Sequence, residues 1–166
     1  MKTERLTGLA LLTAAAMMLS WVESLLPAFT AVPGVKVGLA NTASLFALYM
    51  LSERDAWIVS AVRIILSSVL FGTLFSLVYS ASGAVVSLAI MCLMKKTGLF
   101  SVTGVSVAGG VAHNAGQLAA AMLIMETKGL VYYSVPLIIS GIIAGTVVGL
   151  AAGFLMEHLP ANMIRH

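Results

Sequence analysis

The sequence predicts an all-α, polytopic membrane protein, a bundle of six transmembrane helices forming one domain over residues 1–166. The first observation is composition, because 60% of residues are hydrophobic, only 9% are charged and the mean hydropathy is +1.06. The second is that the apolar runs are continuous rather than alternating, which favours helices over barrel strands. The third is that six runs, each near the length that spans a bilayer, leave only short connections and no room for a soluble catalytic domain. They cover about residues 6–26, 37–51, 56–79, 81–96, 102–126 and 130–156.

The basic residues predict how these helices are oriented. Arg63 lies within the third run, and an N-terminus on the cytoplasmic side would place Lys36 and Lys128 outside. The remaining basic residues would then lie inside, and they are Lys2, Arg5, Arg54, Lys95, Lys96 and Arg165. This bias predicts a multi-pass cell-membrane protein with both termini in the cytoplasm. The same bias accounts for the net charge of +3. We therefore expect the chain to contact membrane lipid and not to bind nucleic acid.

The first run begins like a secretory signal, with Lys2 and Arg5 before an apolar core, but it continues to Leu26 and so favours a retained span. Ala10 and Ala14 stand four residues apart on it. Small residues at this spacing allow close approach of another helix, either within the bundle or on a partner protein.

The segment from Pro27 to Lys36 contains two prolines and a glycine, so it is predicted to be a loop outside the membrane. Most of its residues are apolar, which is typical of a lid folded over a cavity. The second run has only about 15 residues and carries Asn41, so we expect a short helix that lines this cavity.

The third run contains Arg63, for which two interpretations stay open. Its long side chain can reach the inner membrane surface, or it can serve in a structural pair or a coupling role. The fourth run contains Cys92, the single cysteine, which excludes an internal disulfide.

The fifth run is the most polar of the six, with the segment Gly109–Gln117 at its centre. His113 and Gln117 are four residues apart and share a helix face, while Asn114 lies on an adjoining face. Such side chains are costly at membrane depth unless they meet protein, water or ligand. Hydrogen bonding between helices is one interpretation. We favour a ligand-facing role, because neighbouring glycines leave space.

Along the sixth run a glycine recurs every four residues, at Gly141, Gly145, Gly149 and Gly153. This spacing predicts a groove for close helix packing. Packing within the bundle is favoured over contact between copies of the chain.

The motifs of several enzyme classes are absent from the sequence. It contains no Asp-Asp-x-x-Asp motif for magnesium-bound diphosphate and no phosphate-binding loop of the G-x-x-x-x-G-K-[ST] type. The acidic residues and histidines are scattered, so neither a metal site nor a hydrolase triad is expected. We therefore expect no enzyme activity and no cofactor in this chain.

Two sequence blocks carry a resemblance to a known family. The first runs from Pro33 to Asn41 and continues into Leu45–Tyr49, and the second is Gly109–Gln117. Both resemble small membrane proteins labelled "Gx transporter" or "heptaprenyl diphosphate synthase component I". That family is similar to the substrate-binding S components of energy-coupling factor (ECF) vitamin importers.

The resemblance implies a six-helix bundle of ECF S-component type that captures its substrate from outside. It implies docking on an ECF transmembrane scaffold protein driven by two ATPase subunits, with Ala10 and Ala14 at the contact. The chain begins Met1-Lys2-Thr3 and lacks the Met-His start of the nickel and cobalt members, which argues against that substrate class.

Our leading hypothesis is an S component for a small vitamin-like, quinone-precursor or isoprenoid-precursor molecule, with Trp21 and Tyr132 or Tyr133 available to stack on a ring. The candidate substrate contacts are Glu23, Lys36, Asn41, His113, Asn114, Gln117 and Glu126. The first alternative is a non-catalytic membrane subunit of heptaprenyl diphosphate synthesis. The second is a stand-alone transporter or channel, which is disfavoured because no acidic residue is expected in the membrane interior.

Overall fold

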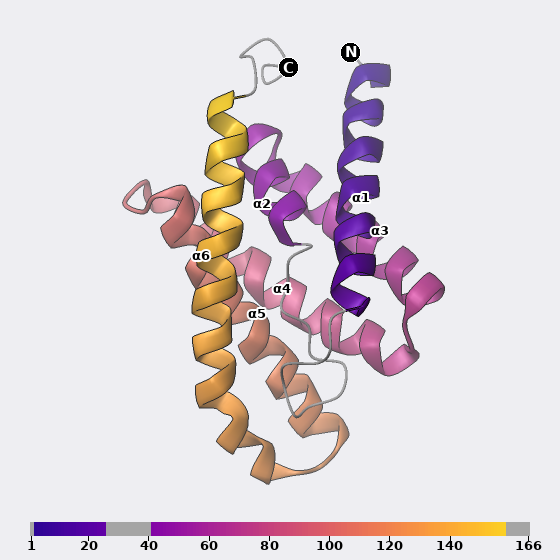
Figure 1. The fold of residues 1–166 in the computed structure, drawn as a ribbon, viewed down its shortest axis with the longest axis vertical. Helices are drawn as coiled ribbons and strands as arrows, with labels where there is room; N and C mark the ends of the chain where they lie inside the picture. The colour runs from indigo at the N-terminus through magenta and orange to yellow at the C-terminus, as the bar shows by residue number, and fades with distance from the viewer. Residues whose placement is uncertain (1, 26–40, 159–166) are drawn as a thin grey trace.

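The computed structural model describes residues 2–25 and 41–158, and the regular structure within those ranges is helical. The elements, shown in Figure 1, are α1 (Lys2–Leu25), α2 (Asn41–Met50), α3 (Glu53–Phe71), α4 (Leu74–Thr97), α5 (Val102–Ile124), the 3₁₀ helix η1 (Lys128–Tyr133) and α6 (Ser134–His158).

Four of these helical segments are long and apolar enough to cross a membrane. They are α1, α4, α5 and the continuous segment formed by η1 and α6. The prediction of an all-helical protein with membrane-spanning helices is therefore confirmed. The count of six spans is not, because α2 has only 10 residues and α3 carries charges at its start and at Arg63.

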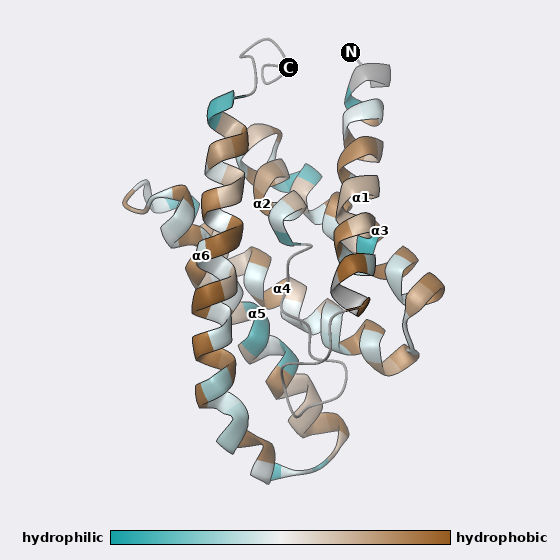
Figure 2. Ribbon diagram, in the orientation of Figure 1, coloured by the Kyte–Doolittle hydropathy of each residue, from teal (hydrophilic) through white to brown (hydrophobic). Residues whose placement is uncertain are grey.

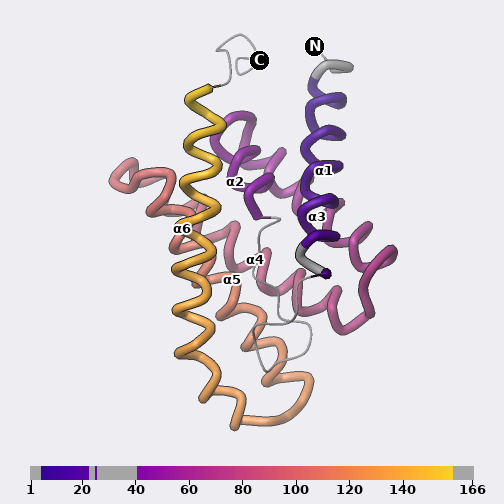
Figure 3. The backbone as a smooth tube through the Cα atoms, viewed as in Figure 1, coloured from indigo at the N-terminus to yellow at the C-terminus, as the bar shows by residue number. Residues whose placement is uncertain are grey.

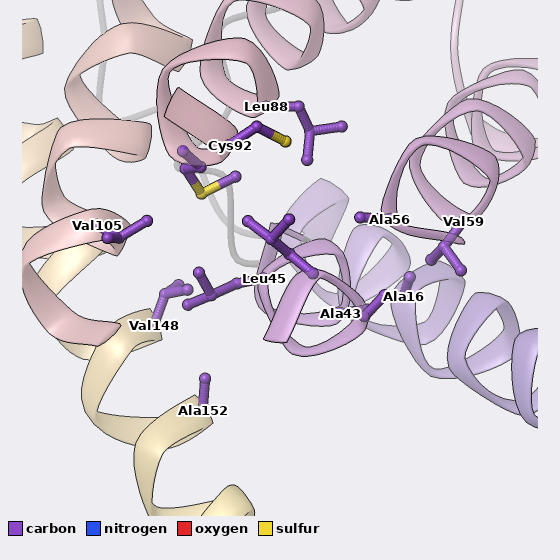
Figure 4. Close-up of a cluster of buried hydrophobic side chains, with 13 residues drawn as sticks. Ala16, Ala43, Leu45, Ala56, Val59, Leu88, Cys92, Val105, Val148 and Ala152 are labelled. Atoms are coloured by element: carbon purple, nitrogen blue, oxygen red, sulfur yellow. The ribbon is translucent and has the colours of Figure 1, made fainter. Parts of the chain in front are cut away.

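The short helix α2 lies at the centre of the bundle. It packs against α1 and α3 on one side and against α4 and α6 on the other. Figure 4 shows Leu45 of α2 between Val105 and Val148 on one side and the smaller Ala43 and Ala16 on the other. Because Leu45 is fully buried, α2 joins the two halves of the bundle through one continuous apolar core.

The predicted boundary between the third and fourth runs is wrong. The expected spans 56–79 and 81–96 are replaced by α3, which ends at Phe71, and by α4, which begins at Leu74. Gly72 is extended there, and the Thr73 side chain accepts a hydrogen bond from the Ser76 backbone amide as an N-cap. Hydropathy misses this corner because its neighbours are apolar. The small polar residues near Ser80 and Gly83, where we expected a break, lie within α4.

The remaining predicted helices need smaller corrections. The first begins at Lys2, the fifth ends at Ile124, and the sixth is divided at Ser134 into η1 and α6. The short helix expected within 37–51 is α2, and residues 37–40 lie outside the described part of the chain.

α5 and α6 form the tightest helix pair, through the predicted glycine groove. A Cβ added at Gly145 would lie 2.6 Å from the Cα of Val107, and one at Gly149 would lie 2.7 Å from the Cα of Thr103. A Cβ added at Gly141 would lie 2.9 Å from the Cα of Val111. The groove thus serves packing within the bundle, as predicted, although a Cβ at the fourth glycine, Gly153, would have nothing within 4 Å.

Charged side chains from α1, α3 and α4 meet at one end of the molecule, which we call the charged end (Arg5, Glu53, Asp55, Lys95 and Lys96). Arg5 Nε donates to Asp55 Oδ1 at 3.2 Å, and Lys96 Nζ lies 3.1 Å from Glu53 Oε2. Lys95 Nζ donates to the carbonyl of Leu48 at 2.6 Å.

The path of the chain, which is easiest to follow in Figure 3, brings the start of α1 and the last turn of α6 to the same end of the molecule. This arrangement agrees with termini on one side of the membrane. Which side they occupy is still a prediction from the distribution of basic residues.

Candidate functional site

Polar side chains from four helices meet inside the bundle, where Figure 2 shows hydrophilic colour interrupting the middle of α5. We call this group the polar layer, and its members are Asn41, Arg63, Ser87, His113, Asn114 and Gln117. All except the half-buried Asn41 are buried, with exposed fractions from 0% for Gln117 to 6% for Arg63.

The polar layer lies near the middle of the expected bilayer. Arg63 is ten residues from Glu53, His113 is eleven from Val102, and Ser87 is eight from Lys95. At about 1.5 Å per residue, these positions lie about 12–17 Å from the helix ends. Half of a hydrocarbon core of about 30 Å is about 15 Å. Buried polar groups at this depth form a functional-site candidate, because the surrounding helices are apolar.

Arg63 and Ser87 are the two members that our sequence-based site prediction missed. One of the Nη atoms of Arg63 donates to Asn41 Oδ1 at 3.3 Å. Because Arg63 is only 6% exposed, the interpretation that its side chain reaches the inner surface is wrong. A lone arginine in an apolar run was the available signal, but sequence could not show which way it points.

The predicted division of α5 into two polar faces is confirmed. His113 and Gln117 lie against α4, where a Cβ on Gly83 would be 2.8 Å from Gln117 Cγ and 2.9 Å from His113 Cε1. Asn114 lies against α6 and donates its Nδ2 hydrogen to the Leu137 carbonyl at 2.8 Å. Asn114 therefore contributes the interhelical hydrogen bond that was the alternative interpretation of this cluster.

Several buried polar atoms of the layer have no hydrogen-bond partner among the described residues. They are Nδ1 of His113, both amide atoms of Gln117, Oδ1 of Asn114 and Oγ of Ser87. Leaving such an atom unsatisfied costs about 1–3 kcal/mol, so native proteins pair them with protein, water or ligand. Gln117 is the clearest case, because its whole side chain is buried and neither amide atom is paired.

A small cavity adjoins the polar layer between α2, α4, α5 and α6. Its polar lining comes from Asn41, Ser87 and Ser106, and its apolar lining includes Leu45 and Met91. The volume of about 10 Å³ suits about one water molecule. Ligand pockets have about 300–1,000 Å³, so this cavity is too small for a ligand as the described helices now lie.

The other predicted contact residues do not join this layer. Glu126 is exposed just beyond the end of α5, with a left-handed φ of 49°. Nine residues separate it from Gln117, which is about 13 Å along a helix. The side chain of Glu23 and the whole of the Pro27–Lys36 loop, including Lys36, lie outside the described residues.

The predicted aromatic and interface residues lie on the surface. Trp21, Tyr132 and Tyr133 are 48%, 84% and 38% exposed, so stacking on a ligand inside the bundle would require them to move. Ala10 and Ala14 are also exposed, on the outward side of α1. Only 11% of the spanning window of α1 is buried within the molecule.

At the charged end, the Arg5–Asp55 pair perturbs a carboxyl group outside the four candidate spans. Burial alone would raise the pKa of Asp55, but hydrogen bonds from Arg5 and Ser52 outweigh it and hold this pKa below its ordinary value of 3.8. Ser52 Oγ donates to Asp55 Oδ2 at 2.7 Å. The carboxylate therefore ties the start of α1 to the start of α3.

Residues 12–155 match one family, which is described as heptaprenyl diphosphate synthase component I. A comparison with curated proteins and one with solved structures found no match. The family description points to a membrane subunit related to heptaprenyl diphosphate synthesis, with another synthase component as its partner. Because the match covers most of the sequence, and because it includes both blocks that carry the resemblance, the chain belongs to the heptaprenyl diphosphate synthase component I family.

Proposed function

We propose that this protein is a substrate-binding membrane subunit acting as the S component of an ECF-type importer. The observation that carries the proposal is the polar layer at mid-depth, in which Gln117 and His113 have buried hydrogen-bonding atoms without a partner among the described residues. A ligand that supplies those partners gains the hydrogen bonds that the protein alone leaves unmade.

The outward face of α1 supports the partner that this role requires. Ala10 and Ala14 are exposed four residues apart on a helix that is mostly uncovered in the monomer. Such a small-residue face permits close packing against a helix of another membrane protein. The sequence has no phosphate-binding loop for ATP, so the energy for import would come from the ATPase partners.

The test is gentle purification of the tagged protein from native membranes, followed by mass spectrometry of bound proteins and small molecules. We expect two ATPases, a membrane scaffold protein and a retained small molecule. An Ala10→Phe, Ala14→Phe variant should lose the scaffold and the ATPases, whereas Leu11→Phe, on the same exposed helix, is the matched control. Recovery of the protein without any ATPase would contradict the importer role.

The second candidate function is a non-catalytic membrane subunit that supports heptaprenyl diphosphate synthesis, and the family description favours it. In that case the same purification should recover a soluble prenyl synthase instead of the ATPases. The two outcomes name different partners, so one experiment separates the two functions.

A further inference from the structure

We propose that the polar layer binds the anionic group, a carboxylate or a phosphate, of an otherwise apolar ligand. Arg63 supplies the charge, and Gln117 and Ser87 donate hydrogen bonds. This inference rests on the proposed substrate-binding role and adds the class of substrate.

The charge argument begins with the position of Arg63. The residue is 6% exposed, and its backbone position lies about 15 Å from the helix end, at ten residues from Glu53. A guanidinium stays protonated at all physiological pH values, and its planar fork of donors matches the oxygen atoms of carboxylates and phosphates. At this depth the attraction to an anion is stronger than in water, because the surroundings are apolar.

Hydrogen-bond donors lie on the neighbouring helices. Gln117 Nε2 and Ser87 Oγ are buried and have no partner among the described residues, and both lie at the contact of α4 with α5. Asn41, which already accepts from Arg63, and Ser87 both line the small cavity. Asn41 thus connects Arg63 with the cavity that Ser87 also lines, and Gln117 lies against Gly83 at the same contact of α4 with α5.

Among the described side chains, none of the acidic ones belongs to the polar layer. Glu53 and Asp55 lie at the charged end, where they pair with Lys96 and Arg5. Glu126 and Glu157 are exposed. The lining of the cavity also includes the apolar Leu45, Met91 and Val148, which suit the uncharged part of the ligand. Because the present volume of about 10 Å³ suits one water molecule, binding of the anion would require the helices around the cavity to move apart.

The experiment measures the thermal unfolding midpoint of the purified full-length protein in a non-ionic detergent, with two pairs of probes. Geranyl diphosphate is compared with geraniol, and decanoate with decanol, so that each pair shares a tail and differs in charge. Inorganic phosphate is the third arm, which separates a free anion from one carried on an apolar tail. We expect an anionic probe to raise the midpoint in a saturable manner and its neutral partner not to do so.

Variants connect the binding to Arg63. Arg63→Gln should weaken the binding of the anionic probe at least about tenfold, and Arg63→Lys should weaken it less because the charge is kept. Arg54→Gln, which removes an exposed arginine from the same helix, is the matched control and should bind as the unmodified protein does. Size-exclusion chromatography verifies folding. If Arg63→Gln does not fold, Arg63→Lys and Gln117→Met carry the test, and both should bind the probe more weakly.

The proposal is overturned if no anionic probe binds, if the alcohols stabilise as well as the anions, or if Arg63→Gln binds as tightly as the unmodified protein. Stabilisation by inorganic phosphate with the same dependence on Arg63 supports the site and identifies its ligand as a free anion. The purification test above reads out partners and not ligand charge. If the protein binds an anionic probe but co-purifies with no ATPase, this inference stands and the importer role is overturned. If it co-purifies with ATPases but binds no anionic probe, the importer role stands and this inference is overturned.

Discussion

At the scale of single residues, neighbours on α5 have different roles. Asn114 is satisfied in part by the Leu137 carbonyl, at 2.8 Å, and so contributes to holding α5 against α6. Gln117 is three residues away and fully buried, yet neither of its amide atoms has a partner among the described residues. The first arrangement is typical of structural hydrogen bonding, and the second is typical of a group kept for a ligand or a water molecule.

This contrast predicts opposite effects on stability for two conservative substitutions. Asn114→Leu should lower the free energy of unfolding by about 1 kcal/mol, because it removes an interhelical hydrogen bond. Gln117→Met keeps the shape and removes unpaired polar atoms, so it should leave stability unchanged or raise it by about 1 kcal/mol. Detergent-mediated unfolding of both purified variants measures the difference. A loss of stability in Gln117→Met as large as that in Asn114→Leu would argue for a structural Gln117.

Asp55 predicts a pH dependence of stability. Its pKa is depressed in the folded state, so the ion pair with Arg5 stabilises the protein above the unfolded pKa of about 3.8, and the benefit is lost as the pH falls through the lower folded pKa. The unfolding midpoint of the unmodified protein should exceed that of Asp55→Asn at about pH 6, and the gap should shrink toward about pH 3. Glu157→Gln, an exposed acid at the end of α6, is the control. A gap independent of pH would contradict the role assigned to this pair.

At the scale of elements, glycines decide how close α5 and α6 come. Three members of the four-residue repeat lie where a Cβ would meet the backbone of α5, and the fourth, Gly153, has open space around it. The sequence repeat is regular over all four positions, but the contact ends after Gly149. The close helix packing that the repeat predicts is therefore found at three of its four glycines.

Gly145→Ala should destabilise the protein by about 2 kcal/mol, because its Cβ would lie 2.6 Å from the Cα of Val107 and backbone cannot easily yield. Gly153→Ala, on the same helix, should be neutral or should stabilise by up to about 1 kcal/mol, because alanine is the better helix former. Comparison of the two variants by unfolding in mixed micelles checks this prediction. Equal effects would mean that α5 and α6 do not pack through this groove.

At the scale of the whole molecule, α2 joins two groups of helices. Leu45 and Leu48 are completely buried between α1 and α3 on one side and the α4–α6 group on the other. The ion pairs of the charged end connect the starts of α1 and α3 with the end of α4. α2 therefore holds the two groups of helices together through one apolar core.

The orientation predicted from the basic residues is tested with single cysteines. Cys92→Ser removes the native thiol, and Lys96→Cys or Lys128→Cys then adds one exposed thiol at either end of the bundle. A membrane-impermeant maleimide added to intact cells should label Lys128→Cys and leave Lys96→Cys unlabelled until the membrane is opened. The opposite pattern would place the charged end outside and reverse the predicted topology.

The sequence alone determined the class of protein, an all-helical one with membrane-spanning helices, and the polar segment of α5, because hydropathy and helical periodicity are local properties. It did not determine how many helices are long enough to span, since it predicted six and the described residues contain four. It also indicated that His113 and Gln117 share a face, since a spacing of four residues fixes this in any helix. The sequence did not predict the corner at Gly72. The backbone turns there through one extended glycine and a Thr73 cap, and the surrounding residues are apolar.

Only the tertiary structure decided that Arg63 points inward to Asn41, that α2 lies at the centre, and that Glu126 stays away from the polar layer. The physical reason is that a side chain's neighbours at membrane depth come from other helices. The crossing and rotation of those helices follow from packing, above all at the glycines between α5 and α6, which a linear pattern does not contain.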